Sequence, residues 1–169
     1  MSIVDIDDLI DEKSRVLLTR PESCGWAACA AIWARVFVLA SPGWKRWPEF
    51  FNTVRDAFSL AMLRCTEPST ISPPELLIVK LESFDIDDDG SAEWELVVDF
   101  IAMISAALDG QDARVCLQTA IRSYLEGLLN VLRNDYAVAA GGVISNDIAM
   151  KQLAADPEWC RAIEFIKAL

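Results

Sequence analysis

The stretch that decides the fold runs from Cys24 to Ala40 and reads CGWAACAAIWARVFVLA. It is apolar on nearly every side, and a second run, Leu96–Leu108, shares this property. A surface helix carries one apolar stripe, whereas a helix that is apolar all round is typical of the centre of a bundle. The sequence therefore predicts an all-α protein built around central helices near residues 24–40 and 96–108.

The other segments repeat their apolar residues at helical spacing, which predicts a bundle of roughly seven to eight helices. Capping boxes at Thr19-Arg20-Pro21-Glu22 and Ser72-Pro73-Pro74-Glu75 mark helix starts, and Asp156 before Pro157 marks another. Helix breaks are expected at Ser41-Pro42-Gly43 and at Gly141-Gly142. The expected helices run from Thr19 to about Ala40, over Lys45–Cys65, Leu76–Leu81, Ser91–Leu108, Gln111–Asn134 and Asn146–Ala155, and from Asp156 onward.

The expected helix Gln111–Asn134 has an amphipathic pattern. Its apolar residues follow three- and four-residue steps, and a polar face lies beside them. The stripe consists of Leu117, Ile121, Tyr124, Leu128 and Leu132. This pattern predicts an outer helix of the bundle.

The composition is that of a folded, single-domain protein. The chain has 169 residues, of which 53% are hydrophobic, and residues 1–169 fit one domain with one core. The N-terminus lacks a basic segment followed by an apolar one, so we expect no secretory signal and a cytoplasmic location. The cysteines form no Cys-x-x-Cys pair and are expected to be reduced, buried residues: Cys24, Cys29, Cys65, Cys116 and Cys160.

Charge and residue content argue against several classes of function. Histidine, the commonest general base and metal ligand, is absent, so we expect no enzyme activity and no cofactor. The net charge of −11 argues against nucleic-acid binding, which depends on clustered Lys and Arg. The run Cys24–Ala40 approaches membrane-spanning length, but Arg35 near its middle would cost ~2.5–3.5 kcal/mol on insertion, so we expect no membrane segment.

The most concentrated charge lies between Glu82 and Asp99, where eight of eighteen residues are acidic and none is basic. This acidic block is either a solvated face or a docking patch for a basic protein surface. Trp94 within it favours docking, because aromatic residues flanked by charges are common anchors. The candidate partner-binding residues are Asp85, Asp87, Asp88, Asp89, Glu93, Trp94 and Glu95.

The run Asp85-Ile86-Asp87-Asp88-Asp89-Gly90 also resembles the first half of a calcium loop. In that interpretation the metal ligands are Asp85, Asp87, Asp89 and Glu93. The twelfth position, where a bidentate Glu belongs, is Leu96, and Glu95 comes one residue early. The same acids suit the start of a helix near Ser91, where negative charge and capping oxygens are favourable. Calcium binding therefore remains an alternative, and the leading interpretation includes no metal.

Arg35 and Asp99 are isolated charges in otherwise apolar helices. Burial of an unpaired charge is costly, so each must reach solvent or find a partner. We hypothesise that the two side chains pair across the central helices.

The aromatic residues near these helices have two possible environments. Trp26, Trp33 and Phe37 repeat along one helix, which favours a place in the core over a ligand pocket. Trp44 and Trp47 lie beside two bases, where they either contact a partner or pack against the end of the bundle.

Three segments follow one another in a recognisable order. They are the Cys- and Trp-rich helix Cys24–Phe37, the acidic stretch from Phe84-Asp85 into the helix ending at Leu108, and the closing helix from Pro157-Glu158-Trp159 to Ile163-Glu164-Phe165-Ile166. This layout resembles the YjaG-like family of uncharacterised helical bacterial proteins, which implies an all-helical fold without an assigned activity. In size and acidity the chain is also similar to small helical immunity proteins of bacterial toxin systems, which block a toxin by covering its active site.

The expected function is therefore that of a non-enzymatic protein that binds a basic partner, in particular an immunity-type inhibitor of a basic bacterial toxin. The alternatives are a calcium-responsive helical regulator, a helical scaffold subunit, and a helical enzyme that uses carboxylates with Mg²⁺. The absence of paired acidic motifs on facing helices counts against the enzyme. The identity of the partner and the oligomeric state are left open by the sequence.

Overall fold

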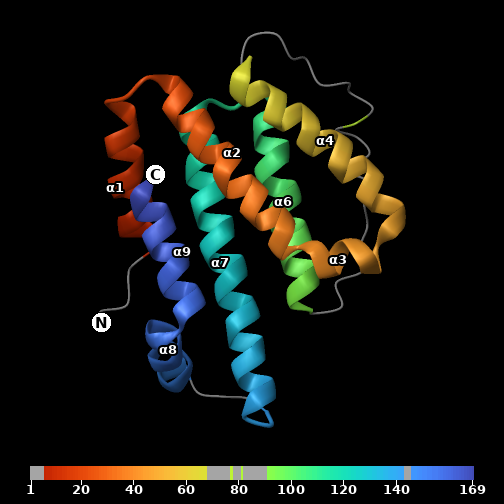
Figure 1. Ribbon diagram of the computed structural model, residues 1–169, viewed down its shortest axis with the longest axis vertical. Helices are drawn as coiled ribbons and strands as arrows, with labels where there is room; N and C mark the ends of the chain where they lie inside the picture. The colour runs from red at the N-terminus through yellow and green to blue at the C-terminus, as the bar shows by residue number, and fades with distance from the viewer. Residues whose placement is uncertain (1–5, 68–76, 78–80, 82–90, 143–145) are drawn as a thin grey trace.

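The described part of the chain forms eight helices (Figure 1). The computed structural model describes residues 6–67, 77, 81, 91–142 and 146–169, and no residue in these ranges lies in a β-strand. The helices are α1 Ile6–Leu18, α2 Glu22–Leu39, α3 Ser41–Arg46, α4 Pro48–Thr66, α6 Ala92–Leu108, α7 Ala113–Ala139, α8 Asn146–Ala155 and α9 Pro157–Ala168. This confirms the all-α single-domain bundle, in which α2 and α6 are the predicted apolar helices.

Helix α7 lies at the centre of the bundle. It packs against α1, α2 and α6, and α8 and α9 pack against it and against each other. In Figure 1, α6 lies on one side of α7, α1 and α9 lie on the other, and α2 crosses in front. The predicted apolar stripe is buried, but the prediction of an outer helix was wrong. Residues beside the stripe are buried as well, so helices surround α7 on several sides: Ala113, Cys116, Ala120 and Leu125.

The core forms where α2, α6 and α7 meet. Trp26 and Trp33 of α2 are 1% and 0% exposed, which confirms their place in the core. Among the described helices, α2 is the one that is long and apolar enough to cross a membrane, by length and composition alone. In this fold one side of α2 lies in the core, while Val38 on its other side is 68% exposed.

The break predicted at Ser41-Pro42-Gly43 is confirmed, because α2 ends at Leu39, but the segment itself begins the short helix α3. Proline is well tolerated in the first turn of a helix, where its missing N–H has no partner to lose. Trp44 is buried and packs against the bundle, and its Nε1 donates to the carbonyl oxygen of Phe37 at 3.0 Å. Its ring centroid lies 5.6 Å from that of Phe37 and 5.7 Å from that of Phe100. This cluster fixes α3 against α2 and α6.

Side-chain caps fix the start of α6 and of α9, and the Asp156 cap was predicted. Ser91 Oγ accepts a hydrogen bond from the Trp94 amide at 3.1 Å, and Asp156 Oδ1 accepts one from the Trp159 amide at 3.0 Å. The capping box predicted at Thr19 is not formed. Thr19 Oγ1 donates to the carbonyl oxygen of Val16 at 2.7 Å and so belongs to the end of α1, while α2 begins without a side-chain cap.

Helix α1 was not among the predicted helices. It buries Leu9, Ile10 and Leu17 against its neighbours. Helix α7 runs five residues beyond its predicted end at Asn134, and the break at Gly141-Gly142 is confirmed by positive φ angles of 75° and 156°. The predicted capping box at Ser72-Pro73-Pro74-Glu75 lies outside the described residues, and of the helix predicted over Leu76–Leu81 only Leu77 and Leu81 are described.

Candidate functional site

Much of the acidic block lies outside the described residues. This holds for four of the candidate residues, Asp85, Asp87, Asp88 and Asp89. The backbone of Glu93 belongs to α6, but its side chain is outside the described part. Partner binding and calcium binding by these residues therefore stay predictions.

The described end of the block is the first turn of α6. The Ser91 cap fixes this turn, and Trp94 and Glu95 are both half-buried within it. One carboxylate oxygen of Glu95, Oε2, is buried and has no hydrogen-bond partner among the described residues. The side chain of Glu95 thus faces the protein in part, whereas Trp94 keeps part of its surface at the solvent.

Asp99 lies further along α6, in the contact with α7. Its Oδ2 atom is so close to α7 that a Cβ atom at Gly127 would lie 3.1 Å from it. Burial, reinforced by the negative charges of Glu126 and Glu95, raises the pKa of Asp99 to about 6. Asp99 forms no ion pair with a described residue, so its charge is held at a cost inside the bundle.

The hypothesis that Arg35 pairs with Asp99 was wrong. The Arg35 guanidinium lies over the ring of Phe165 on α9, 4.2 Å from the ring centroid. Position 35 is on the side of α2 that faces α9, whereas Asp99 faces α7. Arg35 therefore avoids the penalty for a buried, unpaired charge, because it stays exposed and stacks on an aromatic ring.

Helix α1 carries an acidic face that sequence reasoning did not single out. Asp7, Asp8, Asp11 and Glu12 are all exposed. Arg122 on α7 binds Asp7 at 2.5 Å, while Asp11 and Glu12 form no ion pair with a described residue. The signal was available in the sequence, since these acids recur at the spacing of one helix face.

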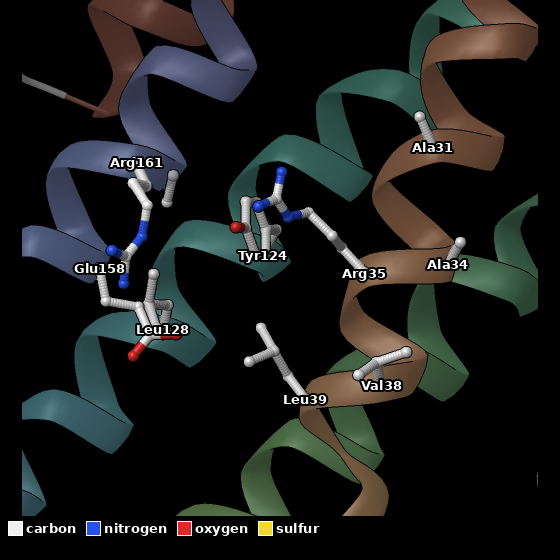
Figure 2. A pocket seen from close by; sticks show the side chains of 10 residues that line it. Ala31, Ala34, Arg35, Val38, Leu39, Tyr124, Leu128, Glu158 and Arg161 are labelled. Carbon is white, nitrogen blue, oxygen red and sulfur yellow. The ribbon is translucent and has the colours of Figure 1, made fainter.

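A groove of about 360 Å³ opens where α2, α7 and α9 meet (Figure 2). Figure 2 shows Arg35 reaching from α2 toward Tyr124 on α7, with Glu158 and Arg161 across the groove on α9. Tyr124 packs edge-on against Phe165, with ring centroids 6.1 Å apart. Apolar side chains complete the walls, chiefly Ala31, Ala34, Val38, Leu39 and Leu128. Sequence analysis had noted Arg35 but not the groove.

Three of the cysteines, Cys29, Cys65 and Cys116, have raised pKa values. All five are free thiols, as predicted, but the prediction that all are buried was wrong: Cys29 and Cys116 are buried, whereas Cys24, Cys65 and Cys160 are half-buried. Burial raises the pKa of Cys65 and of Cys116 to about 11, and burial together with neighbouring thiols raises that of Cys29 further. Thiols with such pKa values are protonated at neutral pH and make poor nucleophiles. Within the described ranges, no group of three or more Cys, Asp or Glu side chains is placed to hold a metal ion.

No protein-family model matches the chain, and neither a curated protein nor a solved structure matches it. The described residues give no positive indication of catalysis.

Proposed function

We propose that the chain is a non-enzymatic protein that binds a basic protein partner, and that it acts in a bacterial cytoplasm as an immunity-type inhibitor of a basic toxin. The observation that carries the proposal is the unbalanced negative charge of the acidic block, with eight acids and no base between Glu82 and Asp99. Its described members Glu95 and Asp99 form no ion pair with a described residue, but both lie partly inside the bundle, so the attraction is assigned to the charge of the block as a whole. Charge that the chain does not neutralise internally is free to attract a cationic surface.

Capture would proceed in two stages. Negative potential around the entrance of α6 speeds the encounter with a basic surface, since complementary charge acts mainly on the association rate. The half-buried ring of Trp94 and neighbouring apolar groups are then covered by the partner, which slows release. Asp11 and Glu12 on α1 add to the negative potential of the whole molecule, whose net charge is −11.

The test measures association with a basic protein encoded next to the gene of this chain. We expect the association rate to fall steeply from about 50 mM to about 200 mM salt, because salt screens exposed charges. Reversing three acids of the block, with D87K, D88K and D89K together, should lower the rate several-fold.

A matched control reverses three exposed acids elsewhere, with D56K, D135K and E164K together, and so reaches the same net charge. We expect this control to slow association much less than the block variant does. An association rate that ignores both salt and the block reversal contradicts the proposal.

Calcium titration separates the main alternative. If Asp85, Asp87, Asp89 and Glu93 form a calcium site, calorimetry should detect heat at millimolar calcium, and D87K should abolish it. If the titration shows no heat, the calcium-responsive regulator is excluded, and the proposal of a protein-binding protein is kept.

A further inference from the structure

We infer that the groove between α2, α7 and α9 is a binding site for a small organic acid, whose carboxylate lies between Arg35 and Arg161 and whose apolar body lies on the side chains of α2 and α7. This inference goes beyond the proposed function and is independent of it. It concerns a different surface and a ligand of a different class from the basic protein partner.

The first observation is that both arginines are available. The chain has 26 acidic and 15 basic residues, so most arginines have a choice of acidic partners. Arg35 and Arg161 nevertheless form no ion pair with a described residue, although Glu158 lines the same groove and the charge of Arg161 helps to lower the pKa of Asp156. Their guanidinium donors therefore remain free for an acceptor from outside, and a carboxylate matches the planar guanidinium fork.

The second observation is that the polar end of the groove is held in place. Phe165 contacts both Arg35, at 4.2 Å from its ring centroid, and Tyr124, edge-on at 6.1 Å. A side chain that is already ordered loses less conformational freedom when a ligand binds. Burial raises the pKa of Tyr124, so its hydroxyl keeps its proton at neutral pH and is a donor for a carboxylate oxygen.

The charge balance of the lining favours a single negative charge on the ligand. Arg35 and Arg161 supply two positive charges, and Glu158 supplies one negative charge, which leaves one positive charge in the groove. A monoanionic carboxylate neutralises this charge, whereas a dianionic phosphate would leave one uncompensated negative charge next to Glu158.

The rest of the groove suits an apolar body. Its volume of about 360 Å³ lies within the range of small-molecule sites in proteins. Val38 is 68% exposed at the mouth, and Leu39 and Leu128 line the wall. A ligand chain of several carbons covers this surface, which otherwise faces water.

The experiment uses octanoate as the probe, with octanol and inorganic phosphate as partial probes. Binding is followed by amide chemical shifts and by calorimetry on the full chain. We expect saturable octanoate binding at millimolar concentration, with shifts centred on Arg35, Leu39 and Tyr124. Octanol lacks the charge and phosphate lacks the apolar body, so each should bind at least several-fold more weakly.

Two variants test the arginines. R35Q and R161Q should each weaken octanoate binding by about tenfold, because each removes charge-assisted hydrogen bonds. R55Q is the matched control, since Arg55 is an exposed arginine of α4 that does not line the groove, and it should leave binding unchanged.

The outcomes decide the inference without ambiguity. R35Q also removes the contact with Phe165, but R161Q has no such contact, and thermal melting of both variants checks that they fold. Loss of affinity in both variants but not in R55Q supports the site. The inference is overturned by absence of saturable octanoate binding, by unchanged affinity in either groove variant, or by phosphate binding as tightly as octanoate.

Discussion

Replacing Asp99 by Asn should stabilise the protein at neutral and alkaline pH. The folded protein holds the Asp99 pKa at about 6, against an ordinary value of 3.8, because the carboxyl is buried beside Glu126 and Glu95. The folded state therefore binds this proton more tightly than the unfolded state does. As pH rises above the unfolded pKa, the unfolded state ionises first and gains stability relative to the folded state, and the penalty is complete above the folded pKa.

The magnitude follows from the same pKa values. The difference between the folded and unfolded pKa values of Asp99 corresponds to a loss of ~3 kcal/mol in the free energy of unfolding once the carboxyl is fully ionised in both states. Asp99 retains part of its exposure, and solvent screens part of the effect, so we expect a gain of ~1–2 kcal/mol for D99N at pH 7.5. The penalty at pH 5 is about half of that at pH 7.5, so the gain should halve as well.

Chemical denaturation of the parent and D99N at both pH values measures these gains in the free energy of unfolding. D11N is the control, because Asp11 is an exposed acid without an ion pair to a described residue, and it should shift stability little at either pH. A D99N variant that is less stable than the parent at pH 7.5, or whose gain is the same at pH 5, would refute the reasoning.

Two further substitutions test the packing and the capping of α7 and α9. G127A should lower the free energy of unfolding by ~1–2 kcal/mol despite the better helix propensity of Ala, because its Cβ would lie 3.0 Å from Leu96 Cδ2; urea denaturation measures the loss, and a gain in stability would contradict it. D156A should cost ~1–2 kcal/mol at pH 7, since Asp156 accepts hydrogen bonds from the Trp159 amide and from the Tyr136 hydroxyl. Burial acts to raise the pKa of Asp156, but these hydrogen bonds outweigh burial and lower the pKa below 3.8. The difference in melting temperature between the parent and D156A should therefore persist above about pH 4 and shrink below it.

The features that the sequence predicted correctly are those determined by residues close together along the chain. An apolar run such as Leu96–Leu108 has to be largely buried in whatever fold forms, and a cap such as Asp156 acts on an amide three residues away. Both can be recognised without knowledge of the other helices. The same local logic failed at Thr19, where two helices compete for one hydroxyl and the end of α1 binds it.

The features that could not be predicted depend on which helices become neighbours. Helical periodicity showed that Leu117 and Leu128 share a face, but it did not show that other faces of α7 are covered too. The sequence identified Arg35 and Asp99 as unusual charges. Arg35 nevertheless contacts Phe165 and not Asp99, because α9 lies beside it. The groove combines side chains from three helices that are far apart along the chain, so no local pattern reveals it.

The length of α7 has a consequence for how the bundle opens. With 27 residues, α7 is ~40 Å long. Its buried residues lie between Ala113 and Leu132, whereas the turns beyond Leu132 expose Asn134, Asp135 and Val138. Amide protons at the enclosed end should exchange with solvent only through global unfolding, while those near Val138 should exchange through fraying that leaves the rest intact. Protection of the amide protons against exchange would then decrease along this one helix. The hydrogen bond from Tyr136 to Asp156 would determine the position at which the decrease begins.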